Sequence, residues 1–357
     1  MVAAYIQRFY TSFLSHVIDI PPRLLALLLF LILLILPVTR PTISIFTILI
    51  TVNIMAIFAA SWDLLVGRTG QMSLGHAFFY GVGAYCTAIL WKFFDLPVWI
   101  TIPISVAICF VFAVLIGYVC LRVKGPYLAL VTMAIPLISI GILFIFPKIT
   151  GGEGGIVEIA GFFPSLDLYS QKTALYYLTF GLSSISALIL YKIANSKTGI
   201  VLVSILDDEL ASEASGINTA YYKVLAFAIS GLFAGLAGAV YAHTYGGANY
   251  QMFLLTLSFL AVMMTLVGGL GTIYGPILGA FILTLLDKYV LSIAIDVPPE
   301  YHLIIFIVPV ILIVILWPRG VARFVTDKLG DLEEARNLDE RGPRIWKKYK
   351  KKEKEAT

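Results

Sequence analysis

The stretch Gly70-Gln71-Met72-Ser73-Leu74-Gly75-His76-Ala77 interrupts a chain that otherwise consists largely of long apolar runs. Lipid-facing helices are built from Leu, Ile, Val and Phe, whereas this stretch brings Gln, Ser, Gly and His to membrane depth. Polar side chains there must face protein or a water-filled route. Small residues allow another helix or a solute to approach the backbone closely. The stretch therefore indicates either part of a transport pathway or a tight helix junction.

The composition around this stretch places the chain among polytopic membrane proteins. Of its 357 residues, 60% are hydrophobic and 13% are charged, whereas soluble domains carry roughly 25% charged residues. So many long apolar runs cannot be buried in one aqueous core, and long apolar runs that cross lipid must be helical. We therefore predict an all-α, polytopic transmembrane helical bundle with broken or Gly-rich helices.

Apolar runs of near-spanning length predict about ten spans. These runs start near Leu24, Ile43, Leu74, Val98, Tyr127, Ala174, Val224, Phe253, Pro276 and Tyr301. The resulting organisation is an N-terminal cytoplasmic segment (1–23), a transmembrane domain (24–317) and a charged cytoplasmic tail (318–357).

The distribution of Lys and Arg predicts the orientation of these spans, because positive loops stay in the cytoplasm. Counting back from the lysine-rich tail puts the loop of about residues 192–222 inside, together with Arg68 and the N-terminus. The loop at 148–172 then falls outside, and it carries Glu153, Glu158 and Asp167. The tail itself is interpreted as a solvated segment and not as a site for nucleic acid or anionic lipid.

The internal cytoplasmic loop contains a sequence typical of one short helix. Ser204 can cap its start, acidic residues in the first turn suit the helix dipole, and Gly216 can end it in a left-handed conformation. An apolar stripe, formed by Leu206, Leu210, Ala214 and Ile217, lies opposite an acidic face. A helix of about a dozen residues is marginal alone in water, so it packs either on this chain or in a groove of a partner. The candidate residues are Leu206, Asp207, Asp208, Glu209, Leu210, Ala211, Glu213, Ala214 and Gly216.

Three polar residues of the opening stretch, Gln71, Ser73 and His76, are candidates for lining or flanking a translocation route. Gln71 and His76 can share a broad face only if the segment is helical, and Gly70 or Gly75 can break it. The alternative is that these residues only join two helices. For the glycines that begin at Gly231, close helix packing is the favoured interpretation.

Several kinds of chemistry have no sequence support. The phosphate-binding pattern Gly-x-x-x-x-Gly-Lys-Ser/Thr is missing, so the chain is not expected to bind or hydrolyse ATP alone. The four histidines are scattered, which argues against a metal site. Cys86, Cys109 and Cys120 are spaced like packing residues. We therefore expect a transport protein and not an enzyme, with no cofactor bound by this chain.

Six motifs follow one another along the chain in a characteristic order and spacing. They are GRTGQMSLGH at 67–76, LRVKGPY at 121–127, TGGEGG at 150–155, DELASEASGIN at 208–218, GGLGT at 268–272 and PRG at 318–320. With these motifs the chain resembles, from about residue 62 to 323, the permease subunits of branched-chain amino-acid ABC transporters, specifically the longer, LivM-type subunit. In the family an Arg usually precedes the acidic run of the cytoplasmic loop, and this chain has Leu206 there instead.

The resemblance implies a division of labour in a bacterial or archaeal cytoplasmic membrane. This chain would pair with a second homologous permease subunit, and two cytoplasmic ATPase subunits, which use ATP and Mg, would bind the cytoplasmic loops. An extracytoplasmic binding protein would deliver the amino acid. The loop at about 192–222 would then be a coupling loop that switches the pathway between inward and outward openings.

Two alternatives remain open from the sequence. One is a permease of the same family for urea or short amides, because an apolar pocket distinguishes a single methylene by only about 1–3 kcal/mol. The other, from a different class, is a self-sufficient secondary transporter or channel. Transport by the reconstituted complex, with and without ATP and binding protein, separates these possibilities.

Overall fold

The computed structural model describes residues 31, 33–120, 123, 125–294, 299–317, 320–322 and 324. It forms two units, Met1–Arg40 with Ala322–Thr357, and Pro41–Val321. Within the first unit the short helix η1 (Leu36–Thr39) is described. The predicted start of a span at Leu24 and the lysine-rich tail lie outside the described residues.

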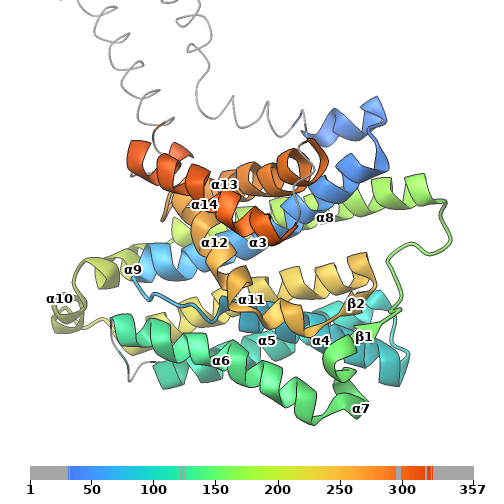
Figure 1. The fold of residues 1–357 in the computed structure, drawn as a ribbon. Helices are drawn as coiled ribbons and strands as arrows, with labels where there is room; N and C mark the ends of the chain where they lie inside the picture. The colour runs from blue at the N-terminus through green and yellow to red at the C-terminus, as the bar shows by residue number, and fades with distance from the viewer. Residues whose placement is uncertain are drawn as a thin grey trace, which may run out of the picture. The chain divides into compact units, whose positions relative to one another are not determined.

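The second unit is helical almost throughout (Figure 1). Its two strands form one short antiparallel pair, in which Ile156 lies opposite Ala248. In chain order the elements are α3 (Ile43–Thr69), α4 (His76–Phe94), α5 (Val98–Cys120), α6 (Pro126–Ile145), α7 (Pro147–Thr150), η2 (Gly152–Gly154), β1 (Ile156–Val157), α8 (Leu168–Ala194), α9 (Lys197–Asp207), α10 (Glu209–Ala214), α11 (Thr219–Tyr245), β2 (Gly247–Ala248), η3 (Tyr250–Phe253), α12 (Leu255–Gly268), α13 (Tyr274–Leu285), η4 (Leu286–Ala294) and α14 (Pro299–Leu316).

The prediction of an all-α, polytopic fold is confirmed. Within the described residues, six helices are long and apolar enough to cross a membrane, namely α3, α4, α5, α6, α8 and α11. The helix α12 is apolar but shorter. The predicted starts at Ile43 and Val98 coincide with the first residues of α3 and α5. The figure of about ten spans remains a prediction.

Helices α3 and α11 form the centre of the unit. Each has 27 residues, and each is packed against other helices over most of its length. The Ser230 hydroxyl of α11 donates to the Ser61 carbonyl (2.7 Å), and the Tyr245 hydroxyl lies against Thr51. Because later residues of α11 pair with earlier residues of α3, the two helices are antiparallel.

Glycines let the helices around α11 approach closely. A Cβ at Gly231 or Gly238 would overlap atoms of Ala113 or the carbonyl of Tyr80, and a Cβ at Gly235 would overlap Cys109. The glycines of α11 therefore face α4 and α5, as the packing interpretation predicted.

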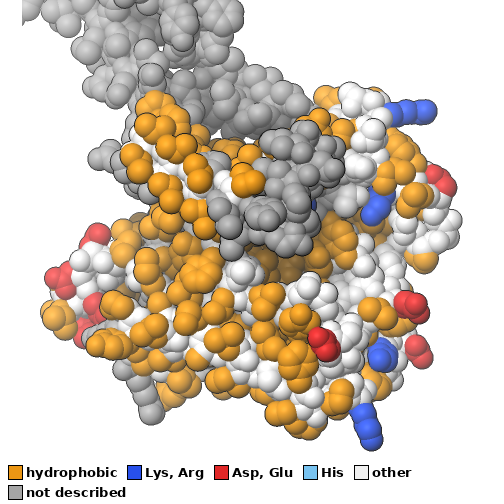
Figure 2. Space-filling view, in the orientation of Figure 1, with side chains coloured by type: hydrophobic (Ala, Val, Ile, Leu, Met, Phe, Trp, Pro, Cys, Tyr) orange, Lys and Arg blue, Asp and Glu red, His pale blue; other side chains and the backbone are white. Residues whose placement is uncertain are grey.

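The outer surface of the unit is banded. Figure 2 shows hydrophobic side chains over most of the visible face, with charged side chains gathered at the α10 end and at the opposite end. Exposed apolar residues of the long helices include Ile104, Leu115, Ile138 and Leu188. A wide apolar band between two charged ends is the surface that a bilayer requires.

Candidate functional site

The opening stretch of the sequence is a break between two helices. α3 ends at Thr69, and Gly70 follows in a left-handed conformation (φ 69°). The chain is then non-helical until α4 begins at His76. The indole nitrogen of Trp62 donates to the Ser73 carbonyl (2.8 Å), so the broken segment runs back along α3.

This geometry places the start of α4 inside the bundle. The His76 ring nitrogen Nε2 lies 2.8 Å from the Ser61 hydroxyl. Ser61 precedes the end of α3 by eight residues, which at 1.5 Å per residue corresponds to about 12 Å. The segment between the two helices therefore runs back alongside α3, from its end to the level of Ser61, before the chain becomes helical again.

A second break follows α11 in the same manner. Gly246 (φ 75°) ends α11, and the chain passes through β2 and η3 before α12 begins. The Ala77 amide at the start of α4 donates to the Ser258 hydroxyl near the start of α12 (2.9 Å). Since α3 and α11 are antiparallel, the two breaks enter from opposite ends and their following helices begin side by side. Discontinuous helices that begin at one depth are typical of transport proteins.

The three predicted pathway residues lie in two places. Ser73 and His76 are in the interior beside α3, with exposed fractions of 1% and 0%. Gln71, at 7%, pairs with Thr69 (3.3 Å) just after the end of α3. The segment is not helical, so Gln71 and His76 do not share a helix face.

The coupling loop contains two helices, and the prediction of a single helix beginning at Ser204 is wrong. Ser204 lies inside α9, where its hydroxyl donates to the Val201 carbonyl (2.8 Å). The chain breaks at Asp208, whose backbone is extended and whose carboxylate accepts from the Ala211 amide (3.0 Å). A side chain that caps a new helix competes with continuation of the old one. Gly216 does adopt the left-handed conformation (φ 84°).

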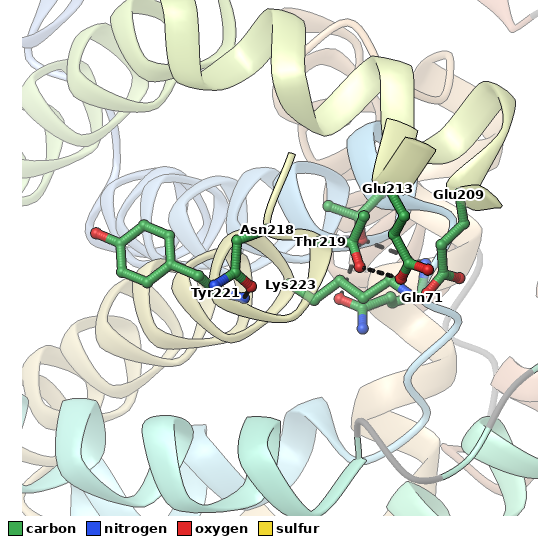
Figure 3. A network of polar contacts seen from close by, with 8 residues as sticks. Gln71, Glu209, Glu213, Asn218, Thr219, Tyr221 and Lys223 are labelled. Carbon is green, nitrogen blue, oxygen red and sulfur yellow. Dashed lines mark hydrogen bonds and ion pairs between the residues drawn. The ribbon is translucent and has the colours of Figure 1, made fainter. Parts of the chain in front are cut away.

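Two acidic residues of the loop are engaged within the chain. Glu209 forms an ion pair with Lys223 (2.6 Å), and Glu213 accepts from the Thr219 hydroxyl (2.7 Å). Both partners belong to the first turns of α11 (Figure 3). These contacts brace α10 against α11, because they connect successive elements on either side of a tight turn.

The predicted apolar stripe faces outward. Leu206 and Leu210 are 43% and 72% exposed, and Ala214 is also exposed. Leu202 and Ile205, also on α9, are buried. The candidates Asp207, Asp208 and Ala211 are exposed beside the stripe. The loop thus presents an apolar ridge with acidic neighbours, at one end of the unit, on a braced support.

Two buried polar groups lie outside the predicted site residues. Asp63 of α3 is fully buried, and its two oxygens accept from the amides of Gly271 and Ile273. His243 of α11 lies 2.9 Å from the hydroxyls of both Thr87 and Thr101 and 2.7 Å from the Ala160 carbonyl. The signal was present in each case as an ionisable residue within an apolar run.

Metal binding has no support within the described residues, where no group of three or more His, Cys, Asp or Glu side chains could hold an ion.

Known proteins resemble the chain over most of its length. The profile of the family "Branched-chain amino acid transport system / permease component" matches residues 44–314. The high-affinity branched-chain amino acid transport system permease protein LivM of Escherichia coli is 28% identical over 269 residues, which cover 69% of this chain and 63% of the relative. This chain therefore spans less than two thirds of the LivM relative.

Two further relatives match the chain, one at a lower identity and one over a shorter segment. The probable branched-chain amino acid transport permease protein LivH of Methanocaldococcus jannaschii is 23% identical, over 67% of this chain and 77% of its own. The autoinducer 2 import system permease protein LsrC of Yersinia enterocolitica is 38% identical over 79 residues, 20% of this chain and 22% of its own. No solved structure shows a significant match.

Proposed function

The chain belongs to the family of permease components of branched-chain amino acid transport systems, and we propose that it is the membrane-spanning subunit of an ABC importer for branched-chain or other hydrophobic amino acids. The protein is a multi-pass component of the inner membrane. In the proposed complex, a second homologous permease subunit completes the pathway, and an extracytoplasmic binding protein delivers the substrate. ATP is hydrolysed by two partner ATPase subunits.

The exposed ridge of Leu206, Leu210 and Ala214 supports the proposed role of the coupling loop. Apolar side chains that project into water from a short helix gain stability when a partner groove covers them. The Glu209–Lys223 and Glu213–Thr219 contacts hold α10 on α11, so a displacement of α10 is passed to a helix that reaches through the bundle. ATP-driven movement of the ATPases would therefore act directly on α11.

A pair of charge insertions tests the docking role. Leu210→Asp places a carboxylate on the ridge, whereas Ile200→Asp does so at a residue of α9 that is equally open, at 68% exposed. We expect Leu210→Asp, alone or with Gly216→Val, to abolish ATPase co-purification and ATP-driven leucine uptake while the protein still inserts. Ile200→Asp should retain both. A fully active ATPase complex with Leu210→Asp would contradict the proposal.

We also propose that the translocation route runs beside the α3–α4 break, with Gln71, Ser73 and His76 flanking it. The meeting of two helix starts at Ala77 and Ser258 supports this, since irregular backbone at membrane depth is tolerated where it lines a cavity. In a cysteine-free protein, Ser73→Cys should be protected from a small thiol reagent at rest and modified during ATP-driven turnover. Equal protection in both states, in an active complex, would argue that the break only joins helices.

The substrate class requires a test of its own. LsrC, which matches only a short segment, is named for import of autoinducer 2, so similarity to this family includes substrates other than amino acids. Competition of labelled leucine uptake by isoleucine, valine, urea and short amides in the reconstituted complex identifies the class. Uptake that needs neither ATP nor binding protein would instead favour a secondary transporter or channel.

A further inference from the structure

The buried carboxylate of Asp63 holds a turn that comes more than two hundred residues later in the chain. Its Oδ1 accepts from the Gly271 amide (2.6 Å) and its Oδ2 from the Ile273 amide (2.9 Å). These amides belong to the turn at 269–273, which connects α12 to α13. A carboxylate removed from water requires such donors, so the pairing fixes where the turn can lie.

The same turn is in backbone contact with α3. A Cβ added at Gly67 would lie 2.6 Å from the Gly271 nitrogen and 2.7 Å from its Cα, so only glycine fits there. Gly67 follows Asp63 by four residues and therefore lies on the same face of α3. The turn itself is held in an unusual conformation, since Ile273 has φ 62°. A non-glycine residue occupies this region only when its surroundings enforce it.

The coupling loop contacts the same end of α3. A Cβ at Gly70 would lie 2.7 Å from Cδ1 of Leu206, and α9 packs along α3. Asp63 and Gly67, near the end of α3, therefore contact the α12–α13 turn. Gly70, which follows α3 directly, contacts the coupling loop. One end of α3 thus contacts both the α12–α13 turn and the coupling loop.

We infer that Asp63 is a positioning residue that fastens the α12–α13 turn to the end of α3, so that α12 and α13 move with the coupling loop as one body during transport. The inference rests on the proposed function, because it assigns a route to the movement that the ATPases produce. It also places α12, whose start contacts the start of α4, under the control of the coupling loop. The chain segments at the two breaks, after α3 and after α11, would then move together and not independently.

Distances between spin labels test the rigid-body statement in the active complex. One label replaces Ile200 on α9 and the other replaces Leu270 in the turn; these residues are 68% and 38% exposed. A reference pair joins Ile200 to Trp99, which is 59% exposed at the start of α5. Between the nucleotide-free state and the state with a non-hydrolysable ATP analogue, we expect the reference distance to change and the Ile200–Leu270 distance to stay constant.

The possible results separate the inference from the proposed function. A change in the Ile200–Leu270 distance as large as that of the reference pair would overturn the inference and leave ATP-driven transport intact. If neither distance changes in a complex that hydrolyses ATP, the proposed coupling fails, and the inference fails with it.

Asp63→Asn tests the carboxylate itself, because an amide oxygen can accept from only one of the two amides while its NH₂ group opposes the other. We expect the assembled complex to hydrolyse ATP at a nearly normal rate but to import several-fold less leucine per ATP. Gly67→Ala should have the same effect, and Gly181→Ala on α8, where a Cβ meets open space, should have none. A normal ratio of leucine to ATP in assembled Asp63→Asn would overturn the inference. If that variant does not assemble, the spin-label distances, measured with Asp63 unchanged, still test the inference.

Discussion

Single glycines determine how closely the helices of this bundle approach one another. At Gly83 of α4 a Cβ would overlap the carbonyl oxygen of Gly235 on α11, whereas at Gly141 of α6 it would meet nothing within 4 Å. We expect Gly83→Ala to lower the free energy of unfolding by about 1–3 kcal/mol through overpacking. Gly141→Ala should be neutral or stabilising by up to about 1 kcal/mol, since Ala favours helix. Thermal unfolding in detergent measures both, and equal effects would contradict the packing role.

The junction at His243 illustrates how a buried polar residue is satisfied. Its Nδ1 must donate to the Ala160 carbonyl, because a carbonyl only accepts. Nε2 is therefore the acceptor in neutral histidine, and the Thr87 and Thr101 hydroxyls both lie within reach of it. Either hydroxyl alone can satisfy it.

This redundancy predicts a non-additive pair of substitutions. Thr87→Val and Thr101→Val should each cost about 0.5–1.5 kcal/mol. The double variant should cost more than their sum, since it leaves Nε2 buried without a donor. A double-mutant cycle from chemical or thermal unfolding gives the coupling energy. Strict additivity would mean that only one threonine serves His243.

Among the elements, α3 and α11 form a natural comparison because both end at a left-handed glycine. Gly70→Ala and Gly246→Ala carry the same backbone penalty, of order 1–2 kcal/mol. At Gly70 the added Cβ also collides with Leu206 of the coupling loop, while at Gly246 it meets nothing within 4 Å. We expect similar losses of stability, but a lower yield of leucine uptake per ATP for Gly70→Ala alone. Equal yields would show that the α3–loop contact does not transmit movement.

The sequence predicted elements well where the signal is local. An apolar run bounded by Pro41 and Gly70 defines α3, and Pro97 precedes α5. The coupling loop was predicted as one helix because Leu206, Leu210 and Ala214 keep a helical period across Asp208. These three residues are all exposed, but the extended backbone at Asp208 separates Leu206 from the other two.

The rest depended on distant partners. The second break, after α11, resembles an ordinary loop in sequence, and it becomes meaningful only because Ser258 meets Ala77. Asp63 lies within an apolar run, and its partners Gly271 and Ile273 are separated from it by 208 and 210 residues. No periodicity within α3 contains that information. Polar residues in spans were recognisable as candidates, but their roles follow from tertiary contacts.

For the whole molecule, the orientation in the membrane is the property that every proposal shares. In the proposed complex the coupling loop faces the ATPases, and the loop between α6 and α8 then faces outward. Both ends carry charged side chains (Figure 2), so the surface alone does not distinguish inside from outside. The distribution of Lys and Arg predicts that residues 192–222 lie in the cytoplasm.

Cysteine labelling in intact cells tests this orientation. Ser165 lies in the predicted outer loop, before α8, and Lys197 is the first residue of α9; both are exposed. The neighbouring Ser196 is left unchanged because its side chain caps α9. In a cysteine-free protein, Ser165→Cys should react with a membrane-impermeant thiol reagent, whereas Lys197→Cys should react only after the cells are permeabilised. Val157→Cys, 66% exposed on β1, is the second outer site and should follow Ser165→Cys. Labelling of Lys197→Cys in intact cells would show that the orientation is the reverse of the predicted one. The ridge of Leu206 and Leu210 could then not contact a cytoplasmic ATPase.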